Sequence, residues 1–302
     1  MYLLLAIFLG THVLLPLFFI YGLWAGVKDR SDWLMHAIYG GIFMVFLFVL
    51  GQWFWISYEV RYASLAVYAI AVAASGWRHR DKSWRAPGTR PFLLRHGFMA
   101  FMCVVFIGMI GYAISGYHPE HEPVELAMPL EDGRYVVAHG GDNSLINYHN
   151  SHNSQRYALD ILRLNGSGAR ASGLFPSELE SYAIFGAKIS SPCNGIVRAV
   201  SDGAADNVPG ETATGDPAGN HIVIECQGVQ VLLAHFVKDS IAVSQNQNVA
   251  IGDALGLAGN SGNSTEPHLH IHAFRSADGD YQSGEGVPVS FGGRFLVRNS
   301  TF

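Results

Sequence analysis

Three histidines near the end of the chain are spaced two residues apart, in the segment Glu266-Pro267-His268-Leu269-His270-Ile271-His272. Side chains two residues apart project from one face of a β-strand, whereas helical zinc motifs place their histidines four residues apart. Leu269 and Ile271 favour the extended chain and would lie on the opposite face. A row of imidazoles on one face of a strand suits a metal site. Because the turn-rich segment 259–265 precedes it, a chance cluster of surface histidines is the weaker interpretation.

Two other side chains are candidates for the same chemistry. A catalytic zinc ion needs three protein ligands, an open position for water and a nearby group that handles protons. Asp160 lies among apolar residues, where a carboxylate is costly unless it has a cationic partner or binds a metal. His235 follows the apolar run Val231 to Ala234, where a lone histidine is usually a satisfied core residue. For both side chains the residues alone leave a structural and a functional interpretation open.

The charged residues are distributed unevenly along the chain, which has 302 residues, 49% of them hydrophobic and only 14% charged. Three stretches without a charged side chain, Met1 to Val27, Trp33 to Tyr58 and His96 to Tyr117, are each long enough to cross a bilayer, which takes about 20 helical residues. A fourth stretch, Tyr62 to Trp77, has 16 uncharged residues between two arginines that can reach the interface. Since no basic region precedes the first stretch, we expect a span there and not a cleaved signal peptide. The pattern predicts an α-helical transmembrane domain of about four spans over residues 1–117.

The loop between the third and fourth predicted spans indicates their orientation. From Arg78 to Arg95 it has six Lys and Arg residues and a single Asp, which marks it as cytoplasmic. The N-terminus and all residues after Tyr117 would then lie outside the cytoplasm. The portion after Tyr117 has 10 Lys and Arg against 20 Asp and Glu. An acidic outer portion argues against nucleic acid as its partner.

The rest of the chain reads as a linker followed by an all-β domain. Residues 118–134 have the proline and glutamate content of an extended linker. Residues 135–302 show short apolar alternations separated by Gly, Asn, Asp and Ser, as in 195–200, 221–225 and 229–235. Such alternations are typical of the strands of an antiparallel sheet.

The three cysteines fall into two groups. Cys103 lies in a predicted span, where we expect a free thiol packed among apolar side chains. Cys193 and Cys226 lie in the outer domain, where an oxidising compartment would allow a disulfide. The sequence does not show whether their Cα atoms approach within about 7 Å, so the pairing stays open.

Taken together, the motifs resemble those of the lysostaphin/LytM-type zinc metalloendopeptidases, a family of bacterial peptidoglycan hydrolases. Asp160, Ala234-His235 and the segment 262–270 resemble, in order, the family's ligand aspartate, catalytic-histidine and His-x-His motifs. The resemblance covers roughly residues 135–290. Supporting matches are the strand start Ser191 to Val197 and the turn Gly252 to Gly256.

The resemblance implies a role for each matching residue. Asp160 and His270 would bind Zn²⁺. His235 and His268 would flank the metal-bound water, orient or deprotonate it, and stabilise the oxyanion of the tetrahedral state. The resemblance gives His272 no role.

The chain departs from the family at the first zinc ligand. In the family this ligand lies four residues before the aspartate, and here that position is Arg156, which cannot bind a metal because its guanidinium stays protonated. The alternatives are His149 and His152, and we favour His149 because variants of the family with Asn-Tyr-His before a Gln-Arg-Tyr-Ala segment look similar. Arg156 would then pair with a carboxylate or with the substrate's carboxyl group.

The family's fold is an antiparallel β-sheet that forms a long groove with zinc on its floor, in agreement with the strands predicted above. The implied function is that of a membrane-anchored, zinc-dependent metalloendopeptidase in which the metal activates a water to hydrolyse a peptide bond. The expected partners are a peptidoglycan peptide as substrate and the lipid bilayer through the N-terminal helices, with no nucleic acid. The expected location is a bacterial inner or cell membrane, multi-pass, with the peptidase domain on the periplasmic or cell-wall side.

Two other classes of function are compatible with parts of the sequence. If neither candidate histidine reaches the metal, the domain would be a catalytically inactive LytM-like regulator of cell-wall hydrolases. A transporter or sensor would need polar residues that form a pathway through the membrane. Besides a few hydroxyls, only His12, His36 and Gln52 qualify within the spans, and helix packing explains them as well.

Overall fold

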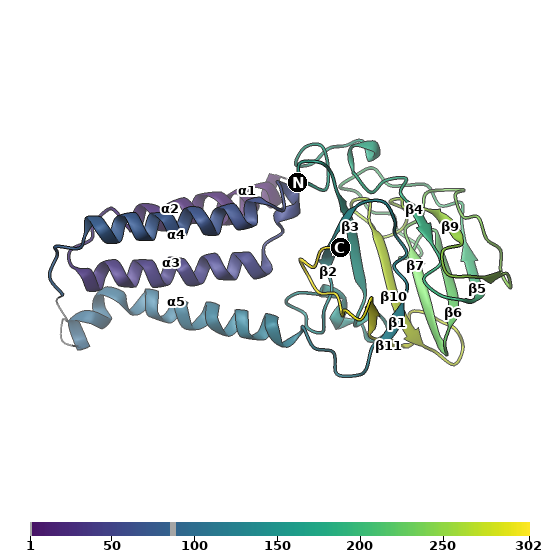
Figure 1. The fold of residues 1–302 in the computed structure, drawn as a ribbon. Helices are drawn as coiled ribbons and strands as arrows, with labels where there is room; N and C mark the ends of the chain where they lie inside the picture. Colours follow the sequence, from purple (N-terminus) through teal and green to yellow (C-terminus); the bar gives the residue numbers. More distant parts are fainter. Residues whose placement is uncertain (1, 85–88) are drawn as a thin grey trace. The chain divides into compact units, whose positions relative to one another are not determined.

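The computed structural model describes residues 2–84 and 89–302 and divides into two compact units (Figure 1). The helical unit comprises Met1–Trp53 and Glu59–Ile114, and the β unit comprises Phe54–Tyr58 and Ser115–Phe302. The short segment Phe54–Tyr58 therefore belongs to the β unit, although in sequence it lies between two helices of the helical unit.

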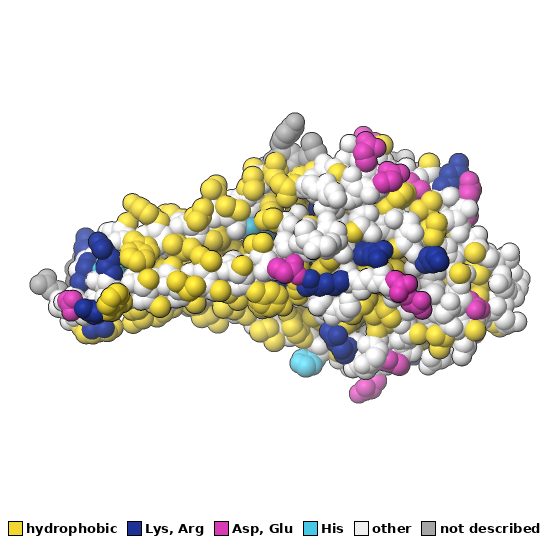
Figure 2. Space-filling view, turned by 45° about the horizontal axis from the view of Figure 1, so that its top comes forward, with side chains coloured by type: hydrophobic (Ala, Val, Ile, Leu, Met, Phe, Trp, Pro, Cys, Tyr) yellow, Lys and Arg dark blue, Asp and Glu magenta, His cyan; other side chains and the backbone are white. Residues whose placement is uncertain are grey.

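The helical unit contains four helical segments that are long and apolar enough to cross a membrane, which confirms the number predicted from the charge-free stretches. Figure 2 shows its surface covered mainly by hydrophobic side chains, with Lys and Arg gathered at one end. The segments are Leu5–Gly22, Arg30–Leu50, Val60–Arg78 and Leu94–Ser115. They are built from α1 (Tyr2–Leu9), a π-helical turn (Gly10–Leu14), α2 (Leu15–Gly22), α3 (Arg30–Leu50), α4 (Val60–Arg78) and α5 (Thr89–Ser115).

The second of these helices is shorter than the charge-free stretch that predicted it. It begins at Arg30, because the Asp29 side chain accepts a hydrogen bond from Asp32 N and caps the first turn. It ends at Leu50, because Gly51 turns the backbone to an extended conformation (φ −64°, ψ 143°). A short 3₁₀ turn, Trp53–Trp55, follows and leads the chain into the β unit.

The β unit is dominated by one antiparallel eight-stranded sheet in the order β2-β3-β10-β7-β6-β5-β8, with β11 paired to β10. This confirms the predicted fold class, a helical N-terminal part followed by an antiparallel β domain. Two small sheets accompany it, β4 with β9 antiparallel and β1 with β12 parallel. The strands are β1 (Val124–Leu126), β2 (Arg134–His139), β3 (Leu159–Leu164), β4 (Lys188–Ser190), β5 (Gly195–Ser201), β6 (His221–Cys226), β7 (Val229–Ala234), β8 (Asn248–Val249), β9 (Ala254–Leu257), β10 (Leu269–Arg275), β11 (Glu285–Val287) and β12 (Val289–Phe291).

The main core of the β unit lies on the face of the sheet opposite the histidines. Leu269 and Ile271 of β10 are fully buried in it, so their neighbours His270 and His272 project from the other face. This is the alternation that the sequence predicted for the strand.

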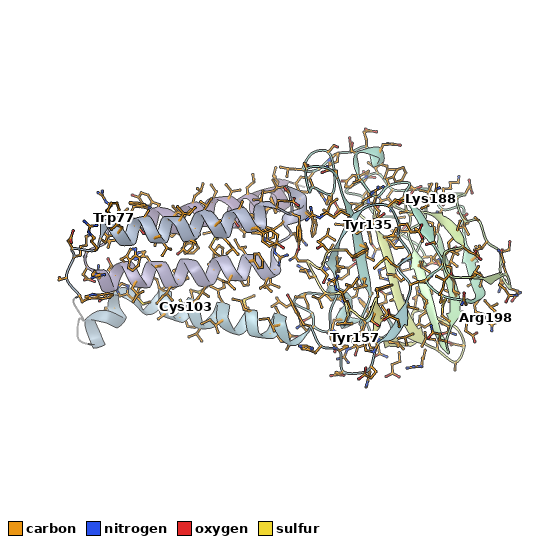
Figure 3. All side chains as sticks on the ribbon, viewed as in Figure 1. Trp77, Cys103, Tyr135, Tyr157, Lys188 and Arg198 are labelled. Atoms are coloured by element: carbon orange, nitrogen blue, oxygen red, sulfur yellow. A yellow bond between two sulfur atoms is a disulfide. The ribbon has the colours of Figure 1, made fainter. Side chains whose placement is uncertain are left out.

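The cysteines separate as the sequence suggested. Cys193 and Cys226 form a disulfide with their Cα atoms 6.0 Å apart, next to the ends of β5 and β6. Cys103 is a buried free thiol on α5 (Figure 3). The disulfide ties two neighbouring strands of the main sheet together.

Candidate metal centre

The register of three neighbouring strands brings the candidate residues together. His270 of β10 pairs with Asp160 of β3 on one side and with Ala234 of β7 on the other. His235 follows Ala234 with a φ of +68°, a left-handed conformation that costs energy for any residue but glycine. Strain of this kind persists where the surrounding structure holds a side chain in a particular direction.

Asp160 lies at the centre of the cluster. One oxygen of its carboxylate is 2.9 Å from His149 Nε2, and the other is 2.9 Å from His270 Nδ1. The Nε2 atom of His268 is 3.5 Å from the carboxylate. Asp160, His149 and His270 are each only 5% exposed.

The donor set of His149, Asp160 and His270 fits a zinc ion. Their ligand atoms lie within 4.8 Å of one another. In a tetrahedral zinc site with bonds of about 2.0–2.1 Å, the ligand atoms lie about 3.3 Å apart, close to the observed contacts. Two imidazole nitrogens and one carboxylate oxygen are also a donor set found in catalytic zinc sites.

The side chains in direct ion-pair distance of Asp160 are imidazoles. Within the described part of the chain, the ion-pair partners of its carboxylate are His149, His268 and His270. Burial by itself raises the pKa of Asp160, but these histidines together hold it well below its usual range. A buried carboxylate that stays ionised without a lysine or arginine within ion-pair distance is the situation that a bound metal would relieve.

His270 is held from both sides of its ring. Burial lowers its pKa to about 4, so the imidazole is neutral at physiological pH and carries a lone pair. Its Nε2 atom is 2.9 Å from Nδ1 of His272, which is 1% exposed. With the proton of His270 on Nε2, the lone pair of Nδ1 faces Asp160. His272, for which the resemblance gave no role, thus contacts the ring that would bind the metal.

His235 and His268 lie beside this set with their rings 4.6 Å apart. Nδ1 of His235 donates to the Ser261 carbonyl at 2.8 Å, and Nδ1 of His268 donates to the Glu266 carbonyl at 2.9 Å. In neutral imidazoles these bonds leave the lone pair on Nε2. Burial lowers the pKa of His235 well below its usual range, so this ring is neutral. With His270, the two rings form a second group of potential ligands whose atoms lie within 4.8 Å.

The two candidates for the missing ligand, His149 and His152, lie in different surroundings. His149 lies in a 3₁₀ turn, Tyr148–Ser151, and its backbone N–H donates to the Asn147 side chain. The Asn147 amide in turn donates to three backbone carbonyls, which fixes the start of the turn. His152, three residues further on, is exposed and belongs to neither group of converging donors.

Arg156, which stands where the family has its first ligand, is engaged elsewhere. Its Nε atom donates to Asp142 at 2.9 Å, and Nη2 lies 3.2 Å from Glu120. The sequence left open a carboxylate or the substrate as its partner, and the structure places it with these two carboxylates.

Two side chains near the cluster were not singled out from the sequence. The ring of Tyr148 packs 3.9 Å from that of His149, and burial together with the nearby Asp160 carboxylate raises the pKa of the Tyr148 hydroxyl. His139 lies opposite Asp160 in the β2–β3 register and forms a 2.9 Å hydrogen bond with Arg298. The position of Tyr148 next to His149 was a usable signal, whereas His139 is brought close only by strand pairing.

A groove of about 280 Å³ adjoins the cluster. None of its lining residues is a Lys, Arg, Asp or Glu. Its lining therefore carries no side chain with a permanent charge. The lining consists of Tyr148, His149, His152, Ser154, Gln155, Pro217, Ala218, Leu232, Ala234, His235, Asn263, His270, His272, Tyr281 and Gln282.

Several solved structures of peptidases are similar in part. A peptidase assigned to family M23 from Pseudomonas aeruginosa is 19% identical, with a TM-score of 0.29, and the match covers 57% of this chain and 54% of that one. A zinc-containing peptidase from Vibrio cholerae is 21% identical, with a TM-score of 0.24, and the match covers 38% of this chain and 46% of that one. The catalytic domain of lysostaphin from Staphylococcus simulans is 18% identical, with a TM-score of 0.25, and the match covers 41% of this chain and 78% of that one. The chain spans about half the length of the first two. These TM-scores are too low for the structural matches to support a family assignment.

The family assignment comes from the sequence. Residues 183–282 match the model of peptidase family M23. The matched segment includes His235, His268 and His270, whereas His149 and Asp160 precede it. No similar protein was found among curated sequences. The match confirms the predicted resemblance to the lysostaphin/LytM-type peptidases, and residues 183–282 are the part of the chain that resembles peptidase family M23.

Proposed function

We propose that the β unit is a zinc-dependent endopeptidase that hydrolyses peptide bonds of peptidoglycan. The observation that supports this most strongly is the buried carboxylate of Asp160, which has imidazoles as its ion-pair partners. A purely structural aspartate at this depth would be expected to pair with a lysine or arginine.

His149 Nε2, Asp160 and His270 Nδ1 would hold the zinc ion. When bound, the zinc would polarise the carbonyl of the scissile amide and lower the pKa of a water to about 7. The alternative group, His235, His268 and His270, lacks a carboxylate and would leave the charge of Asp160 unbalanced beside it. We therefore assign His235 and His268 to proton handling.

The two flanking histidines can act as acid and base because in its neutral form each ring presents the lone pair of Nε2. That atom can accept a proton from the attacking water, and the imidazolium so formed can donate one to the leaving amine. The carbonyls of Ser261 and Glu266 hold the two rings in the required orientation through Nδ1–H. The protonated ring would also stabilise the developing oxyanion.

The groove supports an extended peptide as the substrate. Its uncharged lining favours the neutral part of a peptide stem or crossbridge at the position next to the cluster. Peptidoglycan as the source of this peptide follows from the family resemblance and from the proposed location outside the cytoplasm.

The fold of the β unit supports the proposed membrane topology independently of the charges. Phe54–Tyr58, which lies between α3 and α4, folds with the residues that follow α5, so both must be on one side of the membrane. Two spans, α4 and α5, lie between Phe54–Tyr58 and the residues that follow α5, and an even number of spans returns the chain to the same side of the membrane. The positive loop between α4 and α5 would then be cytoplasmic and the β unit periplasmic or on the cell-wall side. Reporter fusions within residues 79–84 and after Pro119 should report opposite sides, and an outside signal within 79–84 would contradict the orientation.

Metal analysis of the full-length protein in detergent tests the proposed ligand set. We expect one zinc ion per chain, and loss of both zinc and peptidase activity in Asp160→Asn. Asn has the same shape as Asp but no charge, so this variant keeps the packing. A parent protein that binds no zinc and leaves peptidoglycan intact would instead support the catalytically inactive regulator.

A further inference from the structure

Arg170 is a fully buried arginine next to the proposed active site. Its side chain is 1% exposed, and its Nε atom contacts both carboxylate oxygens of Glu266, at 3.0 and 2.8 Å. Nη2 donates to the Leu174 carbonyl at 3.0 Å. Nη1 has no hydrogen-bond partner among the described residues. A buried cation with one unsatisfied nitrogen depends on the other groups that surround it.

Three aromatic rings surround the guanidinium group of Arg170. The guanidinium carbon of Arg170 lies 4.9 Å from the ring of Trp55, 5.9 Å from that of Phe175 and 5.6 Å from that of Tyr182. Distances of this size allow cation–π attraction, which is strongest for tryptophan and increases when the cation is shielded from water. Trp55 is the nearest of the three rings and also packs edge-on against Phe175 at 4.9 Å.

Glu266 connects Arg170 to a proposed catalytic histidine. It lies two residues before His268, and its backbone carbonyl accepts the hydrogen bond from His268 Nδ1. Through its side chain Arg170 holds the residue whose carbonyl sets the tautomer and the orientation of the His268 ring. The opposite nitrogen of that ring, Nε2, then faces Asp160 at 3.5 Å.

Trp55 reaches Arg170 as part of the segment Phe54–Tyr58, which is an integral part of the β unit. Arg170 N donates to the Phe54 carbonyl, and Tyr58 N donates to the Gly168 carbonyl, both at 2.8 Å. Phe54 and Tyr58 are 1% and 3% exposed. They pack against four apolar side chains of β2 and β3: Val136, Ala138, Leu162 and Leu164.

We propose that Trp55 is a positioning residue for the peptidase reaction. Together with Phe175 and Tyr182, the Trp55 ring holds the Arg170 guanidinium in place against the Glu266 carboxylate. The position of Glu266 in turn sets the orientation of the His268 ring. A segment that joins two membrane-spanning helices, α3 and α4, thus completes the active site of the β unit. This inference rests on the proposed function.

The test compares Trp55→Leu with Trp55→Phe in the full-length protein in detergent, using the release of soluble fragments from purified peptidoglycan. Leu removes the π-face and Phe keeps it. A displacement of about 1 Å in a reacting group costs up to about 100-fold in rate. We expect Trp55→Leu to lower kcat by about 10- to 100-fold, with KM and zinc content unchanged, and Trp55→Phe to retain most of the activity. Trp77→Leu is the matched control, since Trp77 is 69% exposed on α4.

A double-variant cycle separates positioning from a general effect on folding. In a His268→Ala background, Trp55→Leu should cause no further loss of kcat, because the ring that it positions is already gone. Equal losses in both backgrounds, or a loss confined to KM, would overturn the inference. If Trp55→Leu fails to fold, Glu266→Gln takes its place, with the same expected non-additivity. An inactive, zinc-free parent would contradict the proposed function itself, whereas an active parent with an equally active Trp55→Leu would contradict only the role of Trp55.

Discussion

The hydrogen bond between His270 and His272 gives a quantitative prediction about zinc affinity. In His272→Leu the N–H of His270 Nε2 loses its acceptor in a site where both residues are at most 5% exposed. An unsatisfied buried donor costs about 1–3 kcal/mol, which corresponds to about 5- to 150-fold in an equilibrium constant. Loss of an outer partner of a metal-binding histidine typically costs about 10- to 100-fold in metal affinity. We therefore expect the dissociation constant for zinc to rise by about 10- to 100-fold.

His272→Asn is the matched control, because Asn and Leu have nearly the same shape. The Oδ1 atom of Asn can take the position of the Nδ1 atom of His272 and accept the same hydrogen bond. Both variants leave the same space where the imidazole ring was, so the difference between them isolates the acceptor. We expect His272→Asn to bind zinc within a few-fold of the parent.

Competition with a chelator of known affinity measures the zinc dissociation constant of each full-length protein in detergent. Thermal melts of the metal-free proteins check that both variants fold equally well. Equal zinc affinities for His272→Leu, His272→Asn and the parent would refute the role of His272. Equal weakening in both variants would show that the ring fills space and does not orient His270.

Three further predictions concern residues of the β unit. His149→Ala should lose both zinc and activity, whereas His152→Ala should keep full zinc content; metal analysis that gave the reverse would exchange the two assignments. His235→Ala should keep zinc and lose about 10²- to 10⁴-fold in kcat, the usual contribution of a positioned acid or base, and loss of zinc would make His235 a ligand. The disulfide closes a loop with a sequence separation of 33, so Cys193→Ala together with Cys226→Ala should lower the free energy of unfolding by about 3–4 kcal/mol; an unchanged melting curve would contradict this.

The alternation of apolar and polar residues along the sequence predicted several strands of the main sheet. The alternations at 195–200, 221–225 and 229–235 became β5, β6 and β7 with ends that differ by no more than one residue. His270 and His272 share a face of β10 because side chains alternate along any strand. Such features depend on neighbours in sequence, so the sequence alone contains them.

The features that the sequence did not predict depend on contacts between distant residues. The second charge-free stretch gave no sign that Phe54–Tyr58 would fold with the β unit, since its aromatic residues suit a membrane interface equally well. His149 lies inside the 3₁₀ turn Tyr148–Ser151 and His152 directly follows it, and the Asn147 cap that orients this turn bonds to carbonyls up to 11 residues away. One of the partners of Asp160, His270, is 110 residues away along the chain.

Digestion of purified peptidoglycan by the full-length protein in detergent, followed by mass spectrometry of the soluble products, tests the proposed function most directly. Parallel reactions contain the parent, the parent with a zinc chelator, and Asp160→Asn. We predict fragments with a new amine and a new carboxyl end at one type of peptide bond, produced by the parent alone. Intact peptide stems and crossbridges after incubation with fully zinc-loaded parent protein would contradict the assignment as a peptidase.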